Sequence, residues 1–366
     1  MKQLFAAILV LLLLAALAGC TAQLPAEEST AASTAPSEEI LTGWQTIDGD
    51  TYCFAEDGTP LSGWRSDLPG SDGSRCYLDE TGKVLTGWQD IDGKRYYFGE
   101  TGAMTTGWFH EEGESYYFGV DGAMFTGLLN IQGKGYYFDQ DGKRYTGWLE
   151  KDGNTYHFDT QGIMAVGPVE IDGQVHHFSP HGIKILLVNP WNPLPEDYEV
   201  ELMNITERDR LETESAEAVQ RMIADCEAAG HKIFIVSAYR TYEEQEYLFS
   251  RKVKYYTKMD WSLNAARKAA AKEVAPPGTS EHQLGLAIDL ADDDYPHLDD
   301  HQAETPTQQW LMEHCHEYGF ILRYPNGTTD ITGIIFEPWH YRYVGVEIAQ
   351  EIMNLGITLE EYLGVA

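Results

Sequence analysis

The chain has 366 residues, with 58 acidic and 25 basic side chains and a formal net charge of −33 at pH 7. This acidic balance disfavours nucleic-acid binding, because affinity for phosphate comes from clustered lysine and arginine. It also disfavours a basic protein of the membrane surface. Hydrophobic residues make up 43% of the chain and aromatic residues 12%, which excludes wholesale disorder. The length predicts two or three folded units.

The first 20 residues have the features of an export signal. Lys2 precedes an apolar run that ends at Leu17 and is shorter than the ~20 residues that a membrane-spanning helix needs. The sequence Leu17-Ala18-Gly19-Cys20 resembles the lipobox of bacterial lipoproteins, which implies cleavage and lipidation at Cys20. An ordinary cleaved signal and an uncleaved anchor are the alternatives. Residues 21–40 lack aromatic side chains, so we expect a flexible tether.

Residues 41–184 repeat with a period of about 20 residues, which is typical of solenoids. A Gly-Trp pair opens most repeats, and an aromatic run such as Tyr96-Tyr97-Phe98 follows a turn such as Asp92-Gly93. Aromatic strands on either side of such a turn predict β-hairpins, which must stack to bury their aromatic faces. The opening pairs are Gly43-Trp44, Gly63-Trp64, Gly87-Trp88, Gly107-Trp108, Gly127-Leu128, Gly147-Trp148 and Gly167-Pro168.

The repeats resemble the cell-wall-binding repeats of Gram-positive surface proteins, which include choline-binding and glucan-binding modules. A choline site needs an aromatic cage around the quaternary ammonium. The position before the Tyr-Tyr pair is usually aromatic in choline-binding repeats, but here it is occupied by Arg95, Ser115, Gly135 and Thr155. We therefore favour a wall glycan or a polymer of the teichoic-acid type as the ligand. The tryptophans that would bind it are Trp44, Trp88, Trp108 and Trp148, with a purely structural stacking role as the alternative.

In residues 185–366 the 20-residue repeats give way to sequence patterns of mixed helices and strands, which predicts an α+β domain. The apolar spacing predicts helices at 214–229, 241–258, 305–318 and 345–355, and strands at 232–237, 284–290 and 332–336. The predicted fold is thus an N-terminal solenoid of β-hairpins followed by a C-terminal α+β domain.

Two short segments of this second domain carry the residues of a metal site. His282, Asp289 and His340 supply two imidazoles and a carboxylate, a ligand set that suits Zn²⁺ with one position left for water. Glu337 would then act as general base. Pro338 disfavours a helix here, so the two histidines do not use the spacing of the helical HExxH motif.

The same residues match the Ser-x-His-x-x-Gly-x-Ala-x-Asp and Glu-x-x-His motifs of zinc D-alanyl-D-alanine carboxypeptidases of the VanY type. The resemblance spans residues 198–364 and implies a zinc metallopeptidase, not a serine-type one, with His282, Asp289 and His340 as ligands and Glu337 as base. It also implies that Arg240 binds substrate charge or the developing oxyanion. Gln245 and Ser280 are further candidates for substrate binding.

The resemblance implies that the enzyme removes the terminal D-alanine from the pentapeptide stems of peptidoglycan at the surface of a Gram-positive cell. An L,D-carboxypeptidase that acts on tetrapeptide stems is the main alternative. A second alternative is a wall adhesin whose peptidase domain has decayed. Only a lipid anchor would attach the protein to the membrane.

The cysteines other than Cys20 allow several disulfide pairings. The candidate disulfides are Cys53–Cys76 and Cys226–Cys315.

Overall fold

The structure is a computed structural model that describes residues 40–70, 73–194 and 198–366. The predicted signal, Cys20 and nearly all of the tether lie outside these residues. The described chain divides into two compact units. The first holds the residues up to Gly87 together with Phe98–Ala103, and the second holds Trp88–Tyr97 and Met104–Ala366. Within the described residues, none of the helices combines the length and the apolar composition needed to cross a membrane.

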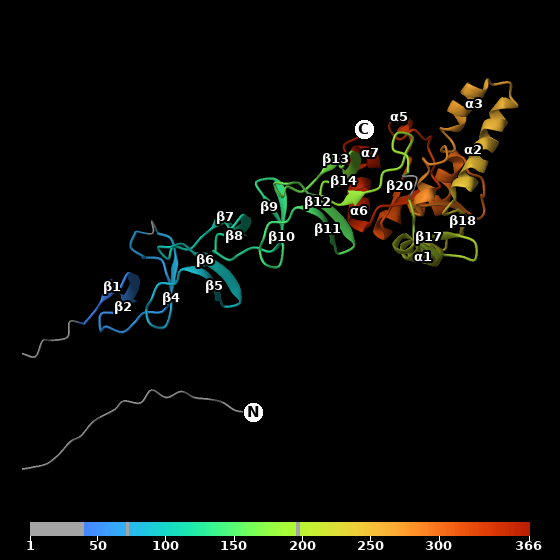
Figure 1. Cartoon of the computed structure of the whole chain (residues 1–366). Helices are drawn as coiled ribbons and strands as arrows, with labels where there is room; N and C mark the ends of the chain where they lie inside the picture. The colour runs from blue at the N-terminus through green and yellow to red at the C-terminus, as the bar shows by residue number, and fades with distance from the viewer. Residues whose placement is uncertain (1–39, 71–72, 195–197) are drawn as a thin grey trace, which may run out of the picture. The chain divides into compact units, whose positions relative to one another are not determined.

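The predicted repeats form antiparallel β-hairpins, labelled in Figure 1. Their turns use residues with positive φ, such as Asp92 (51°) and Gly93 (76°), so both central residues are left-handed, as a tight hairpin turn requires. Leu128 and Pro168 replace tryptophan without preventing hairpin formation. The strands are β1 (Gly43–Ile47), β2 (Asp50–Phe54), β3 (Gly63–Arg65), β4 (Cys76–Leu78), β5 (Gly87–Ile91), β6 (Lys94–Phe98), β7 (Gly107–Glu111), β8 (Glu114–Phe118), β9 (Gly127–Ile131), β10 (Lys134–Phe138), β11 (Gly147–Lys151), β12 (Asn154–Phe158), β13 (Gly167–Ile171) and β14 (Gln174–Phe178).

The cysteines of both units are buried free thiols. Cys53 and Cys76 lie in one apolar cluster of the first unit, with Leu68, Leu78 and Val84. Cys226 and Cys315 lie in the main core of the second unit. The structure therefore contains neither of the disulfides considered above, and all four side chains contribute to apolar packing.

Aromatic rings fill the spaces between consecutive hairpins of the second unit. Trp108 contacts Tyr117 of its own hairpin and Tyr136 of the next one, with ring centroids 5.4 and 5.0 Å apart. Phe138, the last residue of β10, packs against the same indole and is fully buried. Trp108 nevertheless keeps 36% of its surface exposed, and Trp148 keeps 38%. These tryptophans thus contribute to the stacking and also present a ring to solvent.

The last hairpin continues into the second domain without a break in packing. The short strand β15 (Lys184–Ile185) pairs with β14 and spans the expected boundary between residues 184 and 185. The segment after it places Leu187 in the same buried apolar cluster as Ile348 of α6 (Val346–Leu355). At the same junction, His181 Nε2 lies 2.7 Å from a carboxylate oxygen of Glu351.

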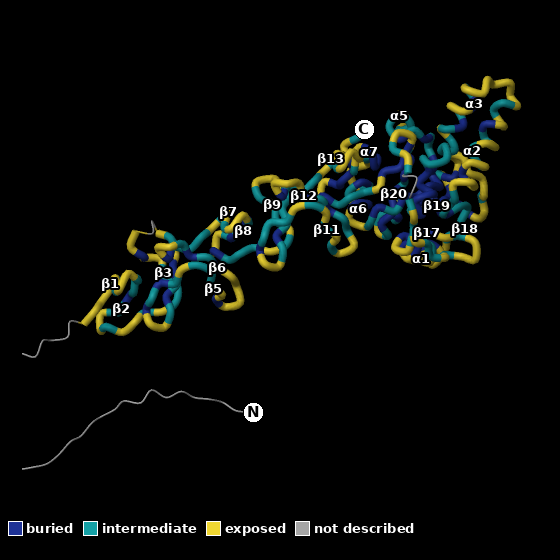
Figure 2. Tube along the Cα trace, viewed as in Figure 1, coloured by how far each residue is buried: buried dark blue, intermediate teal, exposed yellow. Residues whose placement is uncertain are grey.

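The C-terminal domain is built on a four-stranded antiparallel sheet in the order β18-β19-β21-β20. Its strands are β18 (Ile233–Ser237), β19 (Ala287–Asp292), β20 (Phe320–Leu322) and β21 (His340–Tyr343), and β16 (Leu202–Asn204) pairs separately with β17 (Arg210–Glu212). The helices are α1 (Thr213–Ala228), α2 (Tyr242–Thr257), α3 (Leu263–Ala270), α4 (Pro306–His314), α5 (Thr329–Thr332), α6 and α7 (Leu359–Tyr362). Three 3₁₀ turns lie at Glu281–Leu284, Asp300–Glu304 and Cys315–Tyr318. The buried chain gathers around β19 and its neighbours, as Figure 2 shows.

The predicted α+β class and four of the helices agree with the structure, but two predicted strands do not. The strand expected at 332–336 is wrong: α5 ends at Thr332, and Gly333 (φ 81°) turns the chain. The Thr332 hydroxyl donates hydrogen bonds to the carbonyl groups of Thr328 and Ile334. These bonds stabilise a turn, so the segment does not pair with a neighbouring strand. The strand expected at 284–290 begins only at Ala287, because Leu284 ends a 3₁₀ turn that Gly285 (φ 74°) caps.

Candidate active site

Strand register brings the functional side chains of the sheet together. Asp289 of β19 is the register partner of Ser237 on β18 and of His340 on β21. Directly opposite residues on antiparallel strands point to the same face. This explains how His340, far from Asp289 in the sequence, places its Nδ1 atom 3.0 Å from Asp289 Oδ1.

His282 reaches the same point from the 3₁₀ turn before β19. Its Nδ1 atom lies 2.7 Å from the carbonyl oxygen of Ala238, so this nitrogen carries the proton and donates to the carbonyl. The other nitrogen, Nε2, is therefore directed at Asp289 Oδ2, 3.2 Å away. The turn thus holds the imidazole with one nitrogen facing the carboxylate.

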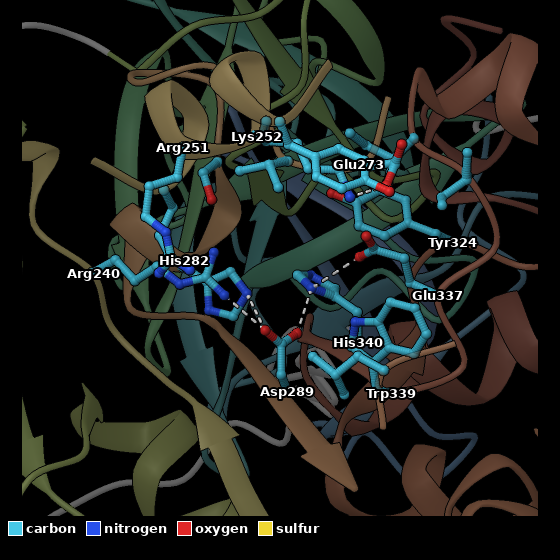
Figure 3. Close-up of a pocket in the computed structure, with 18 residues that line it drawn as sticks. Arg240, Arg251, Lys252, Glu273, His282, Asp289, Tyr324, Glu337, Trp339 and His340 are labelled. Atoms are coloured by element: carbon cyan, nitrogen blue, oxygen red, sulfur yellow. Dashed lines mark hydrogen bonds and ion pairs between the residues drawn. The ribbon is translucent and has the colours of Figure 1, made fainter. Parts of the chain in front are cut away.

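These three side chains have the properties of a metal site. One ligand atom from each of His282, Asp289 and His340 lies within 4.8 Å of the others, and all three residues are buried. Figure 3 shows the two imidazoles on either side of the Asp289 carboxylate. Two imidazole nitrogens and a carboxylate oxygen are a donor set that fits Zn²⁺. The structure therefore brings together all three ligands predicted from the sequence.

The protonation of the ligands follows from burial and from their neighbours. Burial and Arg240 lower the pKa of His282 to about 4, so its imidazole is neutral near pH 7. Burial would raise the pKa of Asp289, but the two histidines hold it well below its usual value. Burial also opposes protonation of His340, but hydrogen bonding to Asp289 raises its pKa to about 9. A metal ion at this point would thus displace a proton chiefly from His340.

Arg240 is held rigidly beside the three ligands. Its NH2 atom donates to Asp289 Oδ2 at 2.7 Å, and its Nε atom donates to Ser237 Oγ at 2.8 Å. NH1 donates to Gln245 Oε1 at 3.2 Å. Gln245 is fully buried and in turn donates to the Ala275 carbonyl. Gln245 therefore fixes Arg240, which leaves two of the five guanidinium N–H groups for a ligand.

Glu337 lies beside His340 and completes the group. Its Oε2 atom is 3.8 Å from His340 Nδ1, and burial raises its pKa to about 8. A carboxyl group with a pKa close to neutral can both accept and return a proton under physiological conditions.

A cavity of about 490 Å³ opens over these residues. Arg240, Ser280, Glu337 and the three candidate ligands all line it, so every predicted site residue of the domain except Gln245 contributes to this cavity. The lining also includes residues that were not predicted as site residues, namely Arg251, Lys252, Tyr255, Glu273, Leu298, Tyr324 and Trp339. Lys252 forms an ion pair with Glu273 on the side of the cavity away from Asp289 (Figure 3).

Beneath the site lies a group of buried charges that the sequence analysis missed. Glu281 is almost fully buried beside His282 and binds Arg323 and Arg342. Its position next to a candidate ligand was the only signal in the sequence. The two arginines have no recognisable motif, because nothing in their spacing tells a buried arginine from an exposed one.

Both halves of the chain are similar to known proteins. Residues 208–346 match the VanY family model, described as D-alanyl-D-alanine carboxypeptidase, and residues 85–127 and 125–167 match the choline-binding repeat model. A D-alanyl-D-alanine carboxypeptidase of Enterococcus faecalis is 40% identical over 179 residues, 49% of this chain and 65% of the relative. The bifunctional D-Ala-D-Ala dipeptidase and carboxypeptidase VanXYC of Enterococcus gallinarum is 44% identical over 138 residues, 36% of this chain and 65% of the relative.

A solved structure of the D,D-pentapeptidase VanY from a VanB-type resistance cassette, a point mutant in complex with Zn(II), is 41% identical. The match covers 48% of this chain and 97% of that one, with a TM-score of 0.45. The chain spans just under two thirds of the length of these curated relatives. Residues 208–346 therefore belong to the VanY family of D-alanyl-D-alanine carboxypeptidases, and they follow an array of repeats of the choline-binding type.

Proposed function

We propose that this protein is a zinc-dependent D,D-carboxypeptidase that removes the terminal D-alanine from peptidoglycan pentapeptide stems. The observation that carries the proposal is the buried group of His282, Asp289 and His340 in the wall of a cavity that also contains Glu337 and Arg240. Three protein ligands with a general base beside them are typical of catalytic rather than structural zinc.

Zinc at these ligands would supply a Lewis acid that polarises the scissile carbonyl and makes water a nucleophile near neutral pH. Glu337 then takes the proton from the attacking water. A bound cation would favour the ionised carboxylate that accepts this proton, and burial, which raises the pKa of Glu337, favours its return to the leaving amino group of D-alanine.

Arg240 stabilises the negative charge that develops on the scissile carbonyl oxygen. Three partners, Ser237, Gln245 and Asp289, fix its guanidinium before substrate arrives. A donor that is already oriented costs no reorganisation in the transition state. Arg251 lines the same cavity and provides positive charge for a substrate that ends in a carboxylate, in a chain that is acidic overall, whereas the charge of Lys252 is balanced by Glu273.

Substrate length separates the proposal from its alternatives. An L,D-carboxypeptidase would act on tetrapeptide stems. A D,D-dipeptidase acts on free D-Ala-D-Ala, and such a soluble substrate gives no reason for a wall-binding array. A pentapeptide stem attached to the wall accounts for both halves of the chain.

The repeats would hold the enzyme on its substrate. Exposed rings such as Trp108 and Trp148 suit the apolar faces of sugars, so we propose a wall glycan or a teichoic-acid-type polymer as ligand. Trp88 is more enclosed: its indole Nε1 donates to Glu111, and several aromatic rings surround it. Trp44 packs against the apolar cluster that contains Cys53 and Cys76.

We further propose a lipid anchor at Cys20, which would keep the enzyme at the outer face of the cytoplasmic membrane.

The reaction is tested with the zinc-loaded protein and three substrates: a pentapeptide stem, a tetrapeptide stem and D-Ala-D-Ala. We expect release of D-alanine from the pentapeptide, identified by mass. Glu337→Gln should lower kcat by at least about 100-fold, because it removes the general base. Glu347→Gln, which alters an exposed carboxylate of α6, is the matched control and should leave the rate unchanged.

Cleavage of the tetrapeptide alone would establish the L,D activity instead. If wild type and Glu337→Gln, with equal zinc content, behave alike on all three substrates, the catalytic role proposed here is wrong.

Zinc binding should release protons at pH 7. In the metal-free protein, His340 and Glu337 have pKa values of about 9 and 8, so both are largely protonated at this pH. Ligation needs neutral His340, and a nearby cation favours ionised Glu337, so we expect release of between about one and two protons. Calorimetry in buffers with different ionisation enthalpies measures this number. Glu337→Gln should release fewer protons than wild type, and a value near zero for wild type would contradict the assigned protonation states.

The role of the repeats is tested by binding to purified cell wall. Trp108→Ala combined with Trp148→Ala should weaken binding, because it removes two exposed aromatic surfaces. Leu128→Ala, at the corresponding position of a hairpin without tryptophan, is the control. Co-sedimentation with and without free choline distinguishes the ligands. Efficient elution by choline would overturn our preference for glycan, and equal binding by wild type and the double variant would show that these rings do not contact the wall.

A further inference from the structure

The two candidate histidine ligands face Asp289 with different nitrogens. His282 presents Nε2, and its Nδ1 donates to the carbonyl oxygen of Ala238. His340 presents Nδ1 to Asp289, so its Nε2 faces the opposite way, into the protein. A neutral imidazole carries its proton on one nitrogen only, and whatever accepts that proton decides which nitrogen is left for the metal. For His282 the acceptor is evident, but for His340 it has to be identified.

The residue that faces His340 Nε2 is Glu281. The distance from Nε2 to Glu281 Oε2 is 3.7 Å, and both residues are almost fully buried, at 4% and 1% exposure. Neither atom has a hydrogen-bond partner among the described residues. Two buried polar atoms that face each other without any other partner each carry a desolvation cost, which a hydrogen bond between them removes.

The other oxygen of Glu281 is firmly held. Oε1 accepts from Arg323 Nε at 2.8 Å and from Arg342 NH1 at 2.9 Å. Arg323 also makes a two-pronged ion pair with Glu360 of α7, at 2.8 and 2.7 Å, and Glu360 accepts from Asn189 at 3.0 Å. Both arginines are completely or almost completely buried. These contacts fix the Glu281 carboxylate, with one oxygen committed to the arginines and the other directed at His340.

We propose that Glu281 is the positioning residue of the metal site: it accepts the Nε2 proton of His340 and so reserves the Nδ1 lone pair for the metal ion. The inference rests on the metal ligands of the proposed function, but it concerns metal affinity and not the substrate. A hydrogen-bonded partner behind a histidine ligand orients the ring and raises its basicity. Ala238 has this role for His282, and Glu281 has it for His340.

The substitution Glu281→Gln tests this role because it reverses the polarity of one contact while keeping the shape of the side chain. Arg323 and Arg342 can only donate, so the amide oxygen must face them. The amide NH₂ group then faces His340 Nε2, where it requires a lone pair. The imidazole proton is pushed to Nδ1, the nitrogen that the metal needs. We expect a rise of about 10- to 100-fold in the zinc dissociation constant, measured by chelator competition.

Glu360→Gln is the matched control. It removes the same charge from the same buried network but has no contact with a metal ligand. We expect a loss of stability similar to that of Glu281→Gln, with zinc affinity within about threefold of wild type. If both variants weaken zinc binding equally, Glu281 acts only through the stability of the domain and the inference is overturned.

A spectroscopic measurement keeps the inference testable even if Glu281→Gln does not fold. In zinc-loaded wild-type protein with ¹⁵N-labelled histidine, nitrogen–proton correlation spectra should show His340 protonated at Nε2 and His282 protonated at Nδ1. Protonation of His340 at Nδ1 would overturn the inference without any variant. Because these measurements follow metal and protons, they remain interpretable if the protein hydrolyses none of the three substrates.

Discussion

The site depends on the position of one carboxylate, that of Asp289. It lies in the middle strand of the row β18-β19-β21, where register places Ser237 on one side and His340 on the other. Its two oxygens lie within 3.2 Å of one ring nitrogen of His282, one of His340 and the guanidinium group of Arg240, so this single carboxylate holds the three side chains together. The geometry of the site is thus a consequence of sheet register, and a shift of one residue would point Asp289 to the opposite face.

The domain surrounds this carboxylate with further buried charges. Arg323 and Arg342 lie beneath it and are compensated by Glu281 and Glu360, so the interior contains ion pairs that would be strongly destabilised by loss of a single partner. The same network reaches the segment that follows the repeats, through Asn189 and the carbonyl group of Leu186. The residues that shape the metal site therefore extend from the end of the repeat array to the last helix of the chain.

The sequence was informative where chemistry is confined to short motifs or exact repeats. The candidate ligands His282, Asp289 and His340, and the neighbouring Glu337, could be named because each lies in a compact pattern of residue types, and the hairpins because of their periodic Gly-Trp and Tyr-Tyr-Phe segments. The segment 332–336 was misassigned because β-branched residues favour strands locally, whereas Gly333 and the Thr332 hydroxyl stabilise a turn in the folded domain. The pairing of Glu281 with His340 could not be predicted, because it depends on how a 3₁₀ turn and a distant strand meet.

X-ray absorption spectroscopy of the zinc-loaded protein tests the central claim most directly. The account predicts one zinc ion per chain with two imidazole nitrogens at about 2.0 Å, oxygen as the remaining donor and no sulfur. Replacement of His340 by alanine should remove one of the two imidazole contributions. A spectrum with sulfur ligands, or one unchanged by His340→Ala, would contradict the assignment of His282, Asp289 and His340 as the metal site.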